Sequence, residues 1–317
     1  MALNGSRPGR YLLEVFKVWA VIATAIGLAI GSGHWWTSVI AIVVVATRQN
    51  CLGLLVHEQT HLGFGGRSGD QGFASRYGDW VCNLLCAYPL LVLSVEGYAK
   101  VHLTHHSSYF NEGDPDYLRK SGDEWAFPKS GGELFKLFLG DLLGLNTLKL
   151  IKGKKAAGGH GISFERRGQV PKWLRPAFLL ALIAALTYFQ VWGYFLLYWF
   201  LPLLVGLPAI VRWGAVCEHE YNRLNADMLA STPIIIQPWW ERLLMPMLNF
   251  GMHAYHHLWP GISFSRLEEV HAIFQREGLV HEDRIFHGSA QYLRFLLGRP
   301  HGETVVDQPV MVSSQQG

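Results

Sequence analysis

The chain has 317 residues, of which 50% are hydrophobic and 16% are charged. Soluble domains carry about 25% charged residues, so this composition indicates a membrane protein with a sizeable polar part. The net charge of +3 is small, and no basic run is interleaved with aromatic residues, which argues against nucleic-acid binding. The cysteines lack C-x-x-C spacing, so we expect free thiols, with a Cys82–Cys86 redox pair as the alternative. The four are Cys51, Cys82, Cys86 and Cys217.

Two apolar stretches near the N-terminus predict a first membrane hairpin. They cover residues 12–31 and 35–56, and a Gly-rich turn joins them. About 20 helical residues span the hydrocarbon core of a bilayer. The apolar part of the second stretch ends near Ala46, so we expect its helix to leave the lipid around Arg48 and to carry residues 51–61 beyond the membrane surface. No small-residue cleavage site separates the two stretches, so a cleaved signal peptide is not expected.

Two further stretches in the middle of the chain have a weaker apolar character. Residues 81–95 are apolar but too short for a span, which predicts a buried or half-inserted helix. Residues 134–151 mix Leu and Phe with Lys136, Asp141 and Lys149. That pattern fits either a helix in the plane of the membrane interface or an ordinary helix packed on a core.

A second hairpin is predicted by apolar stretches at residues 176–192 and 194–211, which Gly193 separates. Pro202 and Pro208 are expected to kink the later stretch. The turns of both hairpins lack Lys and Arg, whereas the other connections are basic. By the positive-inside rule, both termini and the segments that contain residues 57–61, 102–106 and 253–257 then lie in the cytoplasm.

These elements predict one domain over residues 1–299. The expected fold is an all-α integral membrane protein with four transmembrane helices in two hairpins and a cytoplasmic helical cap, located as a multi-pass protein in the inner or plasma membrane. Residues 300–317 are polar and lack periodicity, so we expect them to form a disordered tail.

Histidines are the most unusual feature of the chain. Eight of the 15 histidines fall into three clusters: His57 and His61; His102, His105 and His106; and His253, His256 and His257. Residues at i, i+3 and i+4 share one face of a helix, so each cluster directs its imidazoles to one side. Imidazole suits Zn, Cu, Fe and Ni, and eight imidazoles exceed the needs of one zinc ion. The pattern favours a site for two metal ions over three unrelated clusters of solvated or core histidines.

A ninth histidine is expected at the same place. The second helix of each hairpin leaves the membrane toward the cytoplasm. In the first hairpin it leads to His57 and His61, and in the second it leads through Arg212 to Glu218 and His219. We therefore predict that His219 is a further metal ligand.

The clusters together resemble the membrane fatty acid desaturase and hydroxylase family, whose pattern is H-x-x-x-H followed by two H-x-x-H-H segments. The similarity covers roughly residues 12–273 and extends beyond the histidines. His106 is followed by Asn111 and by Asp114-Pro115-Asp116, and His257 is followed by Leu258-Trp259-Pro260, then by Phe264, Leu267 and His271. His219 matches a further histidine of the family, and some relatives have Asn four residues before it, where this chain has Ala215.

The resemblance implies a non-haem di-iron oxidoreductase in which the nine named histidines bind two iron ions. Family members use O2 and two electrons to remove hydrogen from an acyl or alkyl chain of a lipid. Acyl-lipid desaturation is favoured, and hydroxylation by the same centre is the alternative. The chain has no His-Pro-Gly-Gly sequence typical of cytochrome b5, so a separate ferredoxin, rubredoxin or cytochrome b5 type of carrier is expected to supply electrons.

Carboxylates near the clusters are candidates to support the ligands, because a ligating histidine usually donates its other N–H to a carboxylate or carbonyl. Asp114-Pro115-Asp116 is alternatively a simple turn. The nearest carboxylates in the sequence are Glu58, Asp114, Asp116, Glu218 and Glu220.

Two other function classes are compatible with parts of the pattern. His57-Glu58-Gln59-Thr60-His61 matches the H-E-x-x-H pattern of zinc metalloproteases, with Glu58 as general base. Membrane proteases of this kind take a third ligand from an Asp-Gly pair, which the sequence lacks, and the other clusters would have no role. A metal carrier would need ligands inside its spans, whereas these lie outside them.

Overall fold

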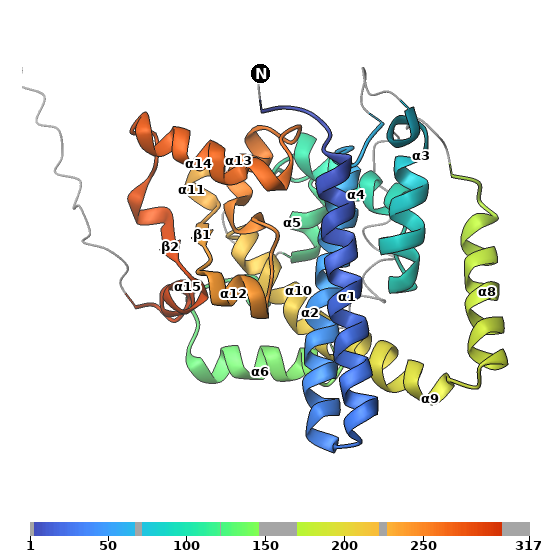
Figure 1. Cartoon of the computed structure of the whole chain (residues 1–317). Coiled ribbons are helices and arrows are strands. Elements are labelled where there is room, and N and C mark those ends of the chain that lie inside the picture. Colours follow the sequence, from blue (N-terminus) through green and yellow to red (C-terminus); the bar gives the residue numbers. More distant parts are fainter. Residues whose placement is uncertain (1–2, 67–71, 121, 146–169, 222–226, 300–317) are drawn as a thin grey trace, which may run out of the picture.

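The computed structural model describes residues 3–66, 72–120, 122–145, 170–221 and 227–299, and most of these are helical. The predicted tail and most of the basic connector between the middle of the chain and the second hairpin lie outside the described residues. Figure 1 shows the long helices α1 and α2 side by side, with a group of shorter helices next to their upper halves. The four cysteines are free and buried.

The first hairpin consists of α1 (Pro8–Ser32) and α2 (Trp35–Thr60), and both are long and apolar enough to cross a membrane. Gly33 ends α1 in the left-handed conformation (φ 67°), and its N–H donates to the Ala29 carbonyl at 3.3 Å. Glycine suits this cap because it has no Cβ atom to clash. The helices expected over residues 12–31 and 35–56 are confirmed, and α2 continues to the first histidine pair.

The segment after α2 is an irregular helix that ends in a sharp break. It comprises α3 (Gly72–Cys82), a π turn η1 (Asn83–Ala87) and a 3-10 turn η2 (Tyr88–Leu90), and it meets α4 (Val95–Ser107) at a bend of 93°. The Asn83 side chain holds the bend, because it accepts from the Val95 N–H at 2.9 Å and donates to Glu96 at 2.9 Å. This pair is apolar enough to be a broken span or a re-entrant loop.

Three short helices follow: α5 (Pro115–Lys120), the 3-10 turn η3 (Asp123–Trp125) and α6 (Gly131–Leu142). A capping box between Ser130 and Glu133 begins α6, since each side chain accepts from the other residue's backbone N–H. The helix expected over residues 134–151 thus starts a few residues earlier and ends at Leu142, and residues 146–151 lie outside the described part of the chain.

The second hairpin differs from the expectation in its first helix. α8 (Leu174–Tyr188) has 15 residues, about 22 Å at 1.5 Å per residue, which is short for a bilayer core of about 30 Å. A continuous 27-residue helix follows, long and apolar enough to span. This helix includes Pro202 and Pro208, and its middle part has π geometry. Its parts are α9 (Trp192–Phe195), the π turns η4 (Leu196–Phe200) and η5 (Pro202–Gly206), and α10 (Leu207–Glu218). Three long apolar helices are therefore found in the described part of the chain, and the four-span arrangement stays a prediction.

The C-terminal part contributes short elements around a small parallel strand pair, which an all-α prediction does not include. β1 and β2 pair with Ile234 opposite Ile285 and Ile236 opposite His287. Ile234 and Ile285 share a buried cluster with Tyr255. The elements are α11 (Met228–Ser231), β1 (Ile234–Ile236), α12 (Trp239–Leu244), η6 (Phe250–Met252), α13 (His253–Leu258), η7 (Phe264–Arg266), α14 (Leu267–Arg276), η8 (Glu282–Arg284), β2 (Ile285–His287) and α15 (Ser289–Leu296).

Candidate metal centre

The nine histidines come from four helix ends that meet in one place. His57 and His61 end α2, the second cluster occupies the last turns of α4, His219 directly follows α10, and the third cluster lies on α13. Ser94 begins α4 by accepting from the Gly97 N–H at 3.1 Å, which fixes where the helix starts and hence which way its histidines face.

Five of these side chains form one group, in which one ring nitrogen from each lies within 4.8 Å of the others: His57, His61, His102, His106 and His256. The Nε2 atom of His102 is 3.0 Å from that of His61 and 2.9 Å from that of His106. Three helices thus contribute to this group.

A second group forms a compact triangle. The Nε2 atoms of His105, His219 and His257 are 3.2–3.3 Å apart in each pair. His253 adjoins this group, since its Nε2 atom is 3.0 Å from that of His257 and its ring is 4.7 Å from the ring of His219. Eight of the nine predicted residues therefore fall into two adjacent groups, and His253 adjoins the second.

These separations fit metal coordination. Imidazole nitrogens bind an ion such as zinc at about 2.0–2.1 Å, so two of them at right angles are about 3 Å apart. Hydrogen bonds within the protein do not satisfy the cluster, because both ring nitrogens of His57 and the Nε2 of His256 are buried without a partner. A buried polar atom left unpaired costs about 1–3 kcal/mol. Metal ions at the two groups would supply the missing partners.

Burial favours the neutral form of several of these imidazoles. Burial lowers the pKa of His256 well below 6.5, and repulsion from His61 adds to the effect. Burial likewise lowers the pKa of His219, with His105 as the next cause, and the pKa of His257, with His253 as the next cause. Only a neutral imidazole can ligate a metal, so burial holds these three histidines in the competent form.

One of the predicted supporting carboxylates contacts the cluster directly. Asp114 is fully buried, and its Oδ2 atom lies 2.8 Å from Nδ1 of His105. The same carboxylate accepts from the backbone N–H groups of Phe110 at 2.9 Å and Asp116 at 2.8 Å. The Asp-Pro-Asp segment is thus both a local turn and a support for His105.

The other suggested carboxylates have different partners. Asp116 is paired with Arg119 and Lys120. Attraction to these cations lowers its pKa, although burial acts in the opposite direction. Glu58 packs against Gly63, since a Cβ atom added to Gly63 would lie 2.4 Å from the Glu58 carboxylate. The same carboxylate accepts from the Phe264 N–H at 3.4 Å.

The last two suggested carboxylates lie around His219. Glu218 is the last residue of α10, and Glu220 accepts from Arg284.

Two supporting residues are absent from the sequence-based prediction. Nδ1 of His219 is 3.3 Å from the Thr232 hydroxyl and 3.4 Å from the Tyr109 hydroxyl. The Tyr109 hydroxyl also lies 2.9 Å from Ser231 and 3.0 Å from Thr232. Tyr109 stands four residues after His105, a helical spacing that could have suggested it, whereas nothing near Thr232 in the sequence indicates this role.

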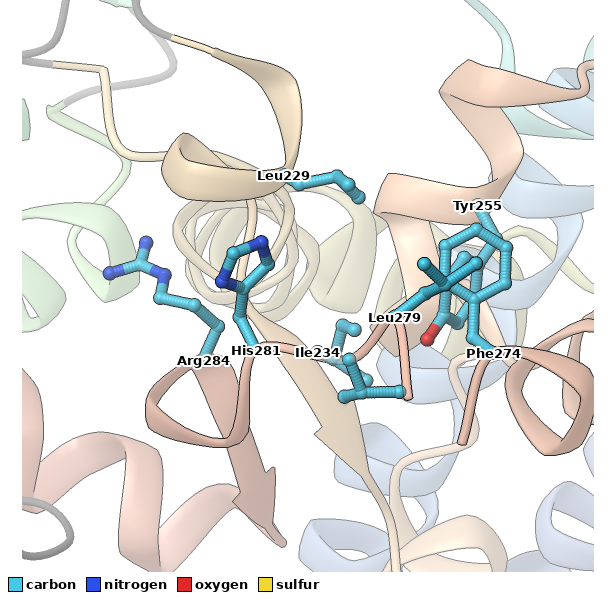
Figure 2. Close-up of a pocket in the computed structure, with 8 residues that line it drawn as sticks. Leu229, Ile234, Tyr255, Phe274, Leu279, His281 and Arg284 are labelled. Atoms are coloured by element: carbon cyan, nitrogen blue, oxygen red, sulfur yellow. The ribbon is translucent and has the colours of Figure 1, made fainter. Parts of the chain in front are cut away.

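A small, mainly apolar pocket lies beside the third cluster. Figure 2 shows Tyr255 and Phe274 on one side of it and His281 and Arg284 on the other. Tyr255 directly precedes His256, but its hydroxyl lies 2.8 Å from Nδ1 of His271, and none of the nine histidines lines the pocket. The pocket is therefore separate from the candidate metal centre.

The comparisons with known proteins agree with the geometry. The family model described as fatty acid desaturase matches residues 33–289, which include all nine histidines. No curated protein matches the chain.

Proposed function

Because this chain belongs to the fatty acid desaturase family, we propose that it oxidises the hydrocarbon chain of a lipid, with its nine clustered histidines as ligands of two iron ions. Family membership implies an oxidoreductase that acts on lipids. The observation that carries the proposal for the metals is the division of the buried imidazoles into two adjacent groups with ring-nitrogen separations near 3 Å.

Each group would bind one ion. The first takes its five ligands from α2, α4 and α13, and the second takes His105, His219, His253 and His257 from α4, α10 and α13. Two such irons, with O2 and two electrons, supply the oxidising power that an unactivated C–H bond requires. Imidazole binds several transition metals, so the choice of iron comes from the family.

The chain's own residues would orient the ligands. Asp114 holds the His105 ring so that its Nε2 atom faces His219 and His257. The hydroxyls of Tyr109 and Thr232 do the same for His219. Because the cluster is buried, water is largely excluded from it, which limits side reactions.

For the reaction, we favour desaturation over hydroxylation. The sequences that follow His106 and His257 resemble those of acyl desaturases more than those of alkane hydroxylases. The test is an assay with reduced carrier protein, O2 and a long-chain acyl lipid, followed by mass spectrometry. Loss of two hydrogen atoms from the product is expected. Incorporation of labelled oxygen into the lipid would show that the reaction is hydroxylation and not desaturation. Turnover without O2 would exclude both reactions.

For the topology, we propose four spans with both termini and the metal centre in the cytoplasm, and a separate ferredoxin, rubredoxin or cytochrome b5 type of electron carrier. Uncharged turns opposite basic connections support this orientation. A reporter fused after Gly317 should lie in the cytoplasm, and a signal from the opposite side of the membrane would contradict the orientation. A zinc protease is not favoured, because the family is one of oxidoreductases and a single zinc would leave most of the nine histidines without a role.

A further inference from the structure

On an ordinary helix at a water-exposed surface, charged side chains face outward and apolar side chains face inward. Helix α12 has the reverse arrangement. Its carboxylate, Glu241, is only 5% exposed and accepts from the N–H and hydroxyl of Ser289 at 2.8–3.0 Å. Its apolar side chains point outward, with Trp239 77% exposed and Leu243 62% exposed. Trp239 and Leu243 are one helical turn apart, so they share a face. Such a face needs an apolar surrounding.

Helix α6 repeats this arrangement. Asp141 is 1% exposed and paired with the buried Arg212 of α10, whereas Phe135 is 67% exposed. Leu139, Leu142 and Leu143 are also exposed, at the i+4, i+7 and i+8 positions relative to Phe135 that continue one helical face. Figure 1 shows α6 lying across the direction of α1 and α2, on the same side of them as α12. Two separate helices thus present apolar faces beside the hairpin.

Both helices are attached to the long helices at a similar level. Arg48 of α2 donates to the Leu243 carbonyl at 2.6 Å, and Arg48 is 13 residues from Trp35, or about 20 Å along the helix axis. The long helix that carries Arg212 passes close to α2 at Gly206, six residues before Arg212, where a Cβ atom on Gly206 would lie 2.7 Å from the Ala46 Cβ. Ala46 is about 17 Å from Trp35.

That level agrees with a position inside one leaflet of the bilayer. Tryptophan is enriched at membrane interfaces, so Trp35 would mark one side of a hydrocarbon core about 30 Å thick. The Arg48 contact then lies about 10 Å, and the Ala46 contact about 13 Å, inside the opposite interface. Amphipathic helices in the membrane plane reach about 5–10 Å, so the α12 contact lies at that depth and the Ala46 contact lies somewhat deeper. The exposed apolar side chains of α2 end one to two turns before Arg48 and are Trp35, Trp36, Val39, Ile40 and Val43. The outward faces of the two helices therefore continue the apolar surface of the span.

We propose that α6 and α12 form a membrane-docking platform that inserts its apolar faces into the leaflet next to the metal centre. The occupant is the acyl region of the bilayer that α2 spans. The inference rests on the proposed membrane span of α2 but not on the metal or the reaction. Since the chain from α12 leads through residues 245–252 to His253, the platform also fixes the third histidine cluster relative to the lipid.

The test is a depth measurement by electron paramagnetic resonance on the full chain in lipid vesicles. Single cysteines for nitroxide labels replace exposed residues, Phe135→Cys on α6 and Leu243→Cys on α12, so the fold is not disturbed. Val39→Cys on α2 is the lipid-exposed control, and Glu277→Cys, at an exposed site after α14, is the aqueous control. The native cysteines are buried, and the unmodified chain gives the labelling background.

The platform predicts that labels at 135 and 243 collide more often with O2 than with a water-soluble nickel complex, as at 39, whereas the label at 277 does the reverse. If 39 is in lipid and either 135 or 243 matches 277, the platform is wrong and the span remains. If 39 also matches 277, the span and the platform both fail. Dipolar broadening between labels at 243 that disappears on dilution with unlabelled protein would assign the face to a second copy of the chain and overturn the proposal.

Discussion

His105 and Asp114 form a buried hydrogen bond of 2.8 Å between Nδ1 and Oδ2. A carboxylate at Nδ1 favours the tautomer that carries the proton there, and the Nε2 atom of His105 faces His219 and His257. This arrangement fixes the ring orientation and favours the tautomer that a metal ion requires.

Replacing Asp114 with Asn should therefore lower metal affinity or activity about 10- to 100-fold, the usual effect of removing such a carboxylate. Asp116→Asn is the matched control two residues away, because Asp116 pairs with Arg119 and Lys120. Iron content and turnover of the two variants provide the measurement. Equal iron loss in both would show that Asp114 has no special relation to His105.

Tyr109 and Thr232 are expected to act as a pair on His219. Since both hydroxyls lie within 3.4 Å of its Nδ1, either one can replace the other in part. Tyr109→Phe and Thr232→Val should each reduce iron affinity less than tenfold, and the double variant should lose more than the two single losses combined. Strictly additive losses in equilibrium iron binding would mean that the hydroxyls act independently.

Acidification should destabilise the metal-free protein. Burial lowers the folded-state pKa of His219, His253, His256 and His257 below the unfolded value of about 6.5. The unfolded chain then binds more protons, so the stabilising contribution is present above pH 6.5 and is lost as the pH falls below it. Thermal unfolding in the presence of a chelator should occur at a lower temperature at pH 5.5 than at pH 7.5. An unchanged or higher midpoint at pH 5.5 would contradict the neutral cluster.

The ion pair between Asp141 and Arg212 should be important for stability, because it joins α6 to α10 two turns before His219. Asp141→Asn leaves a buried guanidinium without its main partner, which costs about 3–5 kcal/mol. Glu269→Gln, in an exposed pair with Arg266, is the control and should change little. Similar denaturation midpoints for both variants would show that the buried pair does not hold α6 in place.

The sequence was sufficient to predict the features that depend on local periodicity. The i, i+3, i+4 spacing of the second and third clusters holds even in α13, which has only six residues. The long helices of the first hairpin follow from composition alone. The common direction of the two hairpins predicts that Glu218-His219 lies near the other clusters.

Features that depend on contacts between distant segments were not predictable. Ile234 and Ile285 form a strand pair across 51 residues, and neither run of three residues is distinctive by itself. Thr232 reaches His219 through the fold of the chain after α10. The break between α3 and α4 depends on Asn83, which bonds across it to Val95. The short α8 has the same apolar composition as a full span, so its length was overestimated.

The most direct test of the metal centre is the number of iron atoms per chain in the purified protein, measured together with that of His105→Ala and His256→Ala, one from each group. Two irons per chain are expected for the unmodified protein, with a loss of iron in both variants. A single zinc ion in the unmodified chain, or two irons retained in both variants, would contradict the assignment.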